Sequence, residues 1–400
     1  MQYDVIIIGA GIIGLSCGMK LLEADPGLKI GILEKEDSIA RHQTGNNSGV
    51  IHSGIYYKPG SLKADNCISG YKELLEFCDN QEIPYEICGK LIVAFNESER
   101  ETLRFLFERG KENGLKGLKK VSKDEISEYE PHVSGVEAVF VPQTGIISFI
   151  EVSGAYKRII EQNGGEIFLS EKVIDIKKNS GGAVETITQN RTFISRLVIN
   201  CAGLYSDNIA MLTSKNIGLR IIPFRGEYYK LKEDRKYLVK NLVYPVPDPS
   251  LPMLGVHFTR LISGEIEAGP NAVFAFSREG YKKTDIDFGE LFGSLFYPGF
   301  IKLAKNYFKT GIMEMRRSFS RKLFAQSLQR LVPEITKADI ERAGAGVRAQ
   351  ACDISGKLID DFVFLEGEGI INVLNAPSPA ATSSLSIGGT IASMAIKRLI

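Results

Sequence analysis

A glycine-rich turn near the start of the chain constrains the fold more than any other feature of the sequence. Gly9, Gly11 and Gly14 form a GxGxxG pattern between an apolar run, residues 5–8, and a stretch with helical spacing, residues 12–24. In such a unit the first glycine permits a tight turn, the second lets backbone approach a diphosphate, and the third lets helix pack on strand. The amides at the helix start then face the anion. The pattern predicts a dinucleotide-binding βαβ unit.

The next strand-like run supports this prediction. Residues 29–33 are followed by Glu34, which stands twenty positions after Gly14. A carboxylate there can accept hydrogen bonds from adenosine ribose hydroxyls. Its negative charge would repel a ribose 2′-phosphate, which disfavours NADP. The motif by itself leaves FAD and NAD open.

Composition excludes several other classes of protein. The chain of 400 residues is 44% hydrophobic and 24% charged, which is typical of a globular protein with more than one core. A net charge of +1 offers no broad field for nucleic acid or an anionic membrane, so we expect no nucleic-acid partner and only local membrane contact. Six scattered cysteines without a CxxC pair predict neither disulfides nor a metal site, and favour a reducing cytoplasm. The N-terminus runs directly into the first apolar run, which leaves no room for a secretory signal.

Strand-like and helical stretches alternate along the chain, which predicts an α/β fold. We expect a discontinuous Rossmann-like nucleotide-binding domain formed by residues 1–80, 145–215 and 330–400. A sheet-rich α+β domain formed by residues 81–144 and 216–329 is expected to interrupt it and to bind the substrate.

Three further segments have unusual sequences: RHQTGNNSGVIHSGIYY at 41–57, VINCAG at 198–203 and NAPSPAATSS at 375–384. They resemble the superfamily of FAD-dependent D-amino-acid oxidases and glycerol-3-phosphate dehydrogenases. The first and third segments are similar in particular to L-2-hydroxyglutarate oxidases and dehydrogenases, and the resemblance covers nearly the whole chain. It implies FAD as the cofactor. It also implies oxidation of L-2-hydroxyglutarate, a small dicarboxylate 2-hydroxy acid, to 2-oxoglutarate by hydride transfer from C2 to flavin N5.

The same segments offer groups that suit a flavin nucleotide. The polar loop after the second strand can bond the diphosphate and the ribityl chain, and a helix start near Ala380 can stabilise negative charge on the reduced ring. The resemblance alone implies that backbone groups of Val173 contact adenine. Beyond Gly9, Gly11, Gly14 and Glu34, the predicted cofactor-binding residues are Thr44, Asn47, Ser48, Gly49, Val173, Ala202, Gly203, Ala380, Thr382 and Ser383.

Two of the four histidines are candidates for proton transfer. His52 lies in the segment expected to pass along the flavin ring, so it is the first choice for the base that accepts the hydroxyl proton. His257 lies in the second domain and is expected to face the ring from the other side. His42 and His132 are expected to make structural hydrogen bonds.

A dicarboxylate substrate requires cationic anchors, and the arginine fork matches a carboxylate. Arg225 and Arg348 rank first because they lie in apolar context. The full set of candidates for substrate binding is Arg225, Arg348, Arg260, Arg278, Tyr56, Tyr57 and Tyr229.

Residues 285–325 combine apolar aromatic side chains with lysines and arginines, a pattern that can seat a helical region in a lipid interface. The apolar run is too short and too broken by Pro298 and Gly299 to span a bilayer. A buried helical hairpin with a solvated basic face is the alternative. Contact with the inner face of the cell membrane would favour a quinone as electron acceptor, and oxygen is the other option.

Two other functions remain open at this point. One is an amino-acid oxidase, or another 2-hydroxy-acid or glycerol-3-phosphate dehydrogenase of the same superfamily. An amine oxidised as its free base needs less help with proton removal, which would leave His52 without a role. The other is a flavin-binding protein without catalysis.

Overall fold

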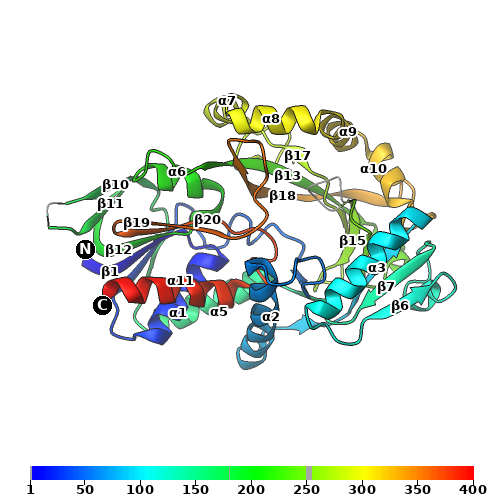
Figure 1. Cartoon of the computed structure of the whole chain (residues 1–400), viewed down its shortest axis with the longest axis horizontal. Coiled ribbons are helices and arrows are strands. Elements are labelled where there is room, and N and C mark those ends of the chain that lie inside the picture. Colours follow the sequence, from blue (N-terminus) through cyan, green and yellow to red (C-terminus); the bar gives the residue numbers. More distant parts are fainter. Residues whose placement is uncertain (1, 180, 249–254) are drawn as a thin grey trace.

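The computed structural model describes residues 2–179, 181–248 and 255–400. Two large sheets and one small sheet organise these residues, with helices against the sheets (Figure 1). The structure confirms the expected α/β class and the presence of a second, sheet-rich region. Residues 249–254, which fall within the range expected to bind the substrate, lie outside the described residues.

The first sheet contains the glycine-rich turn. β1 (Gln2–Ile8) runs parallel to both β12 (Thr192–Asn200) and β2 (Ile30–Leu33), and the sheet order is β10-β11-β12-β1-β2-β9. β20 joins beside β12 and pairs in turn with β19. Strands covered on both faces read as continuous apolar runs, as β2 does. The other strands of this sheet are β9 (Glu166–Phe168), β10 (Val173–Lys178), β11 (Val184–Thr188), β19 (Val363–Gly367) and β20 (Ile370–Asn375).

Three helices pack together on this sheet: α1 (Ile12–Ala24), α5 (Phe149–Gln162) and α11 (Ser384–Leu399) (Figure 1). Small residues let α1 and α11 approach closely, because a Cβ at Gly388 would lie 2.3 Å from Oγ of Ser16. The helix expected near Ala380 begins at Ser384, and the preceding residues form turns. α2 (Leu62–Asn80) packs against α11.

The second sheet has the order β17-β13-β16-β15-β14-β5-β7-β6, with β18 beside β13. β18 (Ile340–Asp353) pairs antiparallel with β13 (Leu219–Leu231) along most of its length. The sequence analysis placed 340–353 with the nucleotide-binding segments, and the structure corrects this. Local pattern cannot identify a strand's partner. The other strands are β5 (Lys90–Ala94), β6 (Lys119–Ser122), β7 (Glu137–Val141), β14 (Leu242–Pro245), β15 (His257–Arg260), β16 (Ile266–Gly269) and β17 (Val273–Phe274).

Four helices form one edge of the molecule beyond β13 and β17, drawn in yellow and orange in Figure 1. They are α7 (Phe288–Leu295), α8 (Pro298–Asn306), α9 (Phe308–Phe319) and α10 (Arg321–Leu328). No helix among the described residues combines the length and the hydropathy needed to cross a bilayer.

Short elements connect the two large sheets. The small sheet has the order β3-β8-β4 and begins where the polar segment after β2 ends. The bounds of the remaining elements are β3 (Val50–Ile51), β4 (Tyr85–Glu86), β8 (Gly145–Ile147), α3 (Glu97–Glu112), α4 (Ile126–Tyr129), α6 (Ser206–Met211) and the 3₁₀ turns Gly203–Tyr205 and Glu233–Leu238.

Candidate active site

Two of the three glycines of the N-terminal turn, Gly9 and Gly14, have close backbone contacts that exclude a larger residue. Gly9 has φ +104°, and a Cβ there would lie 2.6 Å from the carbonyl oxygen of Cys201. A Cβ at Gly14 would lie 2.0 Å from the carbonyl oxygen of Gly9, so no larger residue fits without moving α1. At Gly11 the nearest atom to such a Cβ is Oγ1 of Thr44, at 3.4 Å.

The first turn of α1 leaves amides free for an anion. Ile12 donates its amide to Oγ1 of Thr44 over 3.0 Å. The amides of Ile13 and Gly14 have no acceptor within the described ranges. Glu34 lies beside the turn, since its carboxylate accepts the amide of Ala10 at 2.8 Å. Free amides at a helix N-terminus suit a diphosphate.

The polar segment after β2 is shaped by one side chain. Asn47 accepts the amide of Gly49 at 2.8 Å and donates to the carbonyl of Thr44 at 2.6 Å, so it holds the loop that includes Ser48. Position 49 requires glycine, because its φ of +63° disfavours other residues and a Cβ would lie 2.6 Å from the carbonyl oxygen of Ile147.

The remaining predicted cofactor residues lie at the ends of strands of the first sheet. Val173 is buried at the start of β10. Ala202 follows β12, and its amide donates to Oδ1 of Asn200 at 3.1 Å. Gly203 has φ +52°, which favours glycine, and a Cβ there would lie 3.1 Å from Oε1 of Gln43 in the polar segment.

The loop before α11 contacts the segment that carries His52. Oγ1 of Thr382 accepts the backbone amide of His52 at 3.0 Å. Ala380 closes a turn on the carbonyl of Pro377. The hydroxyl of Ser383 is buried and has no hydrogen-bond partner among the described residues, which suits a bound group with polar edges. These two distant segments therefore lie side by side, as a shared flavin requires.

His52 is neutral at physiological pH. Its Nε2 lies 3.2 Å from Oγ of Ser378. The pKa of His52 is lowered to about 3, mainly by burial, with smaller contributions from the charges of Lys90, His257 and Lys63. A neutral imidazole can accept a proton. Tyr57 lies nearby, since its hydroxyl also interacts with Ser378.

His257 has a defined tautomer. Its Nδ1 lies 2.9 Å from the carbonyl oxygen of Gly255, so Nδ1 carries the proton and Nε2 the lone pair. The ring stacks on Tyr244 with centroids 3.9 Å apart. Burial lowers its pKa to about 3, with contributions from Arg348 and Lys90. Lys90 acts electrostatically on both imidazoles, so His52, His257 and Lys90 belong to one group of neighbouring side chains.

Arg348 belongs to the same group. It lies on β18, and a Cβ at Gly346, two residues earlier, would be 2.2 Å from the carbonyl oxygen of Asn46. The strand therefore passes directly by the polar segment. Arg348 donates to the carbonyl of Asn271 at 3.3 Å, and it lies near Tyr228, whose pKa is raised to about 12 by burial.

Lys90 and Tyr228 complete the group, and the sequence analysis missed both. Lys90 is 1% exposed, although lysine is almost never fully buried. Side chains alternate between the two faces of β13, so Tyr228 and Tyr229 point in opposite directions. Which of the two tyrosines faces the histidines depends on how β13 pairs in the sheet, and the sequence alone does not reveal that pairing.

The other predicted substrate anchors make contacts within the protein, and their role in substrate binding stays a prediction. Arg225 contacts Glu227 at 3.1 Å, and Arg260 contacts Glu86 at 2.5 Å. Arg278 forms a two-pronged pair with Asp207 and is buried. Tyr229 packs in the core against Phe324, with ring centroids 4.4 Å apart. Tyr56, by contrast, lies in the group, with Lys90 over its ring.

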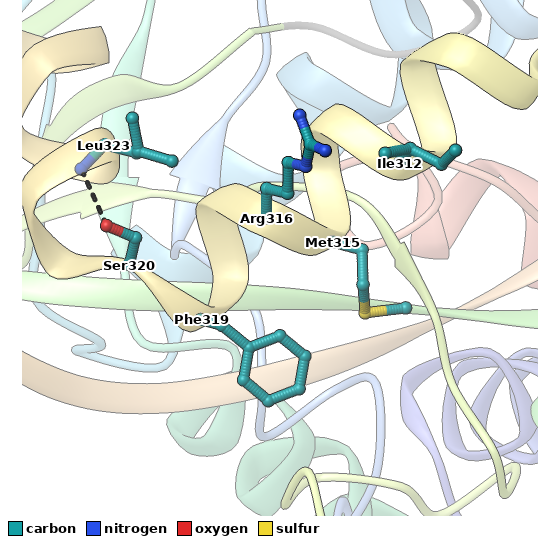
Figure 2. Close-up of a pocket in the computed structure, with 6 residues that line it drawn as sticks. All are labelled: Ile312, Met315, Arg316, Phe319, Ser320 and Leu323. Carbon is teal, nitrogen blue, oxygen red and sulfur yellow. Dashed lines mark hydrogen bonds between the residues drawn. The ribbon is translucent and has the colours of Figure 1, made fainter.

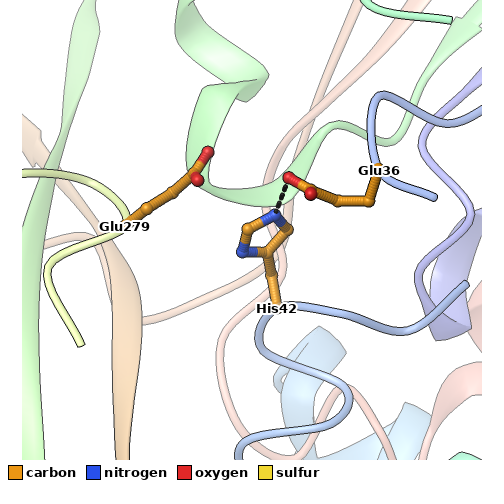
Figure 3. A group of neighbouring side chains, drawn as sticks. All are labelled: Glu36, His42 and Glu279. Carbon is orange, nitrogen blue, oxygen red and sulfur yellow. Dashed lines mark hydrogen bonds and ion pairs between the residues drawn. The ribbon is translucent and has the colours of Figure 1, made fainter. Parts of the chain in front are cut away.

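A second polar cluster joins Glu36, His42 and Glu279, as Figure 3 shows. His42 contacts Glu36 at 3.0 Å through Nε2 and the hydroxyl of Tyr281 at 2.8 Å through Nδ1. The ammonium of Lys35 contacts Glu279 at 2.5 Å and also contacts Glu36, so the chain supplies the cation itself. The cluster ties the segment after β2 to the second sheet.

Comparison with known proteins identifies the family to which the chain belongs. A family model described as DAO, FAD dependent oxidoreductase, matches residues 4–394. The chain is similar in fold to an L-α-glycerophosphate oxidase from Mycoplasma pneumoniae with FAD bound, with a TM-score of 0.80, 24% identity and coverage of 100% and 95% of the two chains. A glycine oxidase from Geobacillus kaustophilus gives a TM-score of 0.74 at 15% identity, over 99% and 95%.

Curated relatives are more similar in sequence. The L-2-hydroxyglutarate dehydrogenase of Indibacter alkaliphilus is 54% identical over 399 residues, covering 100% of both chains. That of Escherichia coli K12 is 42% identical over 98% of this chain and 93% of its own. The human mitochondrial enzyme is 43% identical over 98% and 88%. The chain belongs to the DAO family of FAD dependent oxidoreductases and, within it, to the L-2-hydroxyglutarate dehydrogenases.

Proposed function

We propose that this chain oxidises L-2-hydroxyglutarate to 2-oxoglutarate with FAD as its cofactor. The observation that carries the proposal is the group formed by two neutral histidines, His52 and His257, next to the buried Lys90 and the partly exposed Arg348. A hydroxy acid needs a neutral base for its hydroxyl proton and cations for its carboxylates. The names of the relatives supply the substrate.

Each residue of this group has its own proposed role in the reaction. FAD supplies a two-electron acceptor that takes the C2 hydrogen of the substrate as hydride. The lone pair of an imidazole accepts the hydroxyl proton, and His52 is assigned this role because Thr382 and Ser378 hold it against the loop before α11. His257, whose Nε2 also carries a lone pair, is the second candidate for accepting this proton. Arg348 binds a carboxylate, and Tyr57 lies close enough to His52 to complete the polar surface.

The cofactor site is proposed at the N-terminal turn and the segments beside it. The free amides of Ile13 and Gly14 would bind the diphosphate, and Glu34 the adenosine ribose. The buried hydroxyl of Ser383 and the turns before α11 would contact the polar edge of the ring. The assignment of Thr44, Asn47, Ser48, Gly49, Val173, Ala202, Gly203, Ala380 and Thr382 to the same site stands as part of this proposal, as do the domain ranges apart from 340–353.

The four outer helices are proposed to rest on an anionic membrane. Phe288 and Phe296 are 67% and 75% exposed, and with Phe292 they form a stacked row on α7. A hollow on α9 and α10 is lined by Ile312, Met315, Arg316, Phe319, Ser320 and Leu323 (Figure 2).

These exposed side chains favour a surface contact over the buried hairpin that the sequence left open. Large apolar side chains at the surface mark an interaction site, and the neighbouring lysines and arginines favour anionic headgroups. We propose a membrane quinone as the electron acceptor for this reason, with oxygen as the alternative outcome.

One anaerobic titration tests the function. Purified protein with bound FAD is mixed with each enantiomer of 2-hydroxyglutarate and with a set of L-amino acids, and flavin absorbance is followed. We expect rapid bleaching by the L enantiomer alone. Bleaching by an amino acid but not by L-2-hydroxyglutarate would make the chain an amino-acid oxidase, and no bleaching by any of them would favour a non-catalytic flavoprotein.

A further inference from the structure

Among the residues that the structure describes, Lys90 is a buried cation without an anionic partner. It lies on β5 between Leu242 of β14 and Val141 of β7, near the middle of the second sheet, and it is 1% exposed. Within the described ranges, no carboxylate forms an ion pair with its Nζ. Burying an unpaired positive charge costs free energy. A substrate anion that binds beside Lys90 would offset this cost.

Two aromatic rings hold the ammonium group in place. Nζ lies 4.4 Å from the ring centroid of Tyr56 and 4.9 Å from that of Tyr244. Cation–π contacts offset part of the desolvation and leave the N–H groups available for an acceptor. The hydroxyl of Tyr56 is also buried without a hydrogen-bond partner among the described residues. An ammonium and an orphaned phenol together form a donor set for one carboxylate.

The position of Lys90 relates it to both histidines. Tyr244, which contacts Lys90, also stacks on His257, and Lys90 acts electrostatically on His52. Lys63, the other lysine close to His52, is already paired with Asp360 at 2.7 Å. Lys90 is therefore the unpaired lysine of this group.

We propose that Lys90 binds the C5 carboxylate of the substrate and thereby selects dicarboxylic over monocarboxylic 2-hydroxy acids. This inference rests on the proposed function. The C1 carboxylate must hold C2 in a fixed orientation for hydride transfer, which suits the rigid fork of Arg348. The C5 carboxylate is remote from C2 and only has to be bound. The ammonium group at the end of the flexible lysine side chain is sufficient for that.

The test compares two substrates of equal length. L-2-Hydroxypentanoate has the five-carbon chain of L-2-hydroxyglutarate with a methyl group in place of the C5 carboxylate. In Lys90→Met we expect kcat/KM for L-2-hydroxyglutarate to fall by at least about 30-fold, mainly through KM. The value for L-2-hydroxypentanoate should stay within about threefold of wild type. Lys63→Met removes a charge of the same sign near His52 and should not distinguish the two substrates.

A binding measurement separates this inference from the function itself. Glutarate has both carboxylates and no hydroxyl, so its binding to the FAD-containing enzyme can be followed by flavin absorbance without turnover. Lys90→Met should weaken glutarate binding but not pentanoate binding, and Lys90→Arg, which keeps the charge, should restore most of it. Equal loss with both ligands, or no loss with glutarate, would overturn the proposal. If glutarate binding depends on Lys90 while L-2-hydroxyglutarate fails to bleach the wild type, the inference stands and the proposed reaction fails.

Discussion

Nε2 of His52 and Oγ of Ser378 lie 3.2 Å apart, although 326 positions separate them in the chain. The contact joins the segment after β3 to the loop before α11. A second bond, from the amide of His52 to Oγ1 of Thr382 at 3.0 Å, fixes the backbone at the same place. The ring of His52 is therefore oriented by the loop that is proposed to contact the flavin.

Replacing His52 by alanine should slow flavin reduction while leaving a folded, yellow protein. A general base contributes about 100-fold or more, so we expect the limiting rate of anaerobic reduction by L-2-hydroxyglutarate to fall by at least that factor. Stopped-flow absorbance measures the rate. Ser378→Ala is the matched control: it leaves the imidazole in place, and a loss of no more than about tenfold is expected. Unchanged reduction in His52→Ala would remove His52 from the mechanism.

The activity of the wild type should decrease above neutral pH. Burial lowers the pKa of Lys90 to about 7, so its positive charge is present below that pH and lost above it. Because kcat/KM reports the free enzyme, its value for L-2-hydroxyglutarate should fall as pH rises through about 7. Both histidines have pKa values of about 3, so no acidic limb is expected between about pH 5 and 7.

Lys90→Arg tests this assignment. An arginine stays charged throughout the range, so the alkaline decrease should disappear. If kcat/KM of the wild type instead rises as the pH increases through about 6.5, a histidine titrates near its ordinary pKa.

The nucleotide-binding unit could be predicted from sequence because its determinants are local. Gly9 and Gly14 each meet a steric or backbone requirement set within a few residues or beside the neighbouring strand. The helix predicted at 12–24 has those same bounds in the structure. His52 was identified because it lies inside an unusual run of sequence.

The anchors for the substrate could not be predicted in the same way. Whether an arginine is free depends on partners distant in sequence, such as Gly280 and Lys282, whose carbonyls accept from Arg225. The proposed role of Lys90 depends on two tyrosines from different segments, whose rings contact its ammonium group. The placement of β18 depends on its long pairing with β13, which no local pattern reveals.

The third glycine of the turn is expected to be essential for cofactor binding. In Gly14→Ala, the new methyl group would lie 2.0 Å from the carbonyl oxygen of Gly9, so α1 must shift away from β1. We expect loss of bound FAD and a fall in the melting temperature of several degrees. Gly389→Ala is the control, because apart from the backbone of α11 itself no atom of the described residues lies within 4 Å of the added Cβ. It should keep FAD and melt at or slightly above the wild-type temperature.

The last prediction concerns the aromatic row on α7. Replacing Phe288, Phe292 and Phe296 together by serine should weaken binding to anionic vesicles by about 100-fold, since each ring contributes about 1 kcal/mol when it leaves water. Cosedimentation with vesicles measures the binding. Reduction of a vesicle-bound quinone should fall with it, while reduction of a soluble dye stays unchanged.

Phe105 provides the matched control for this surface. It is 57% exposed on α3, outside the four helices, so Phe105→Ser should bind vesicles as the wild type does. The binding should also weaken with added salt, because lysines and arginines on α8 to α10 contribute through their charge. If the wild type ignores vesicles but self-associates, and the triple variant is a monomer, the same surface is an interface between two copies of the chain.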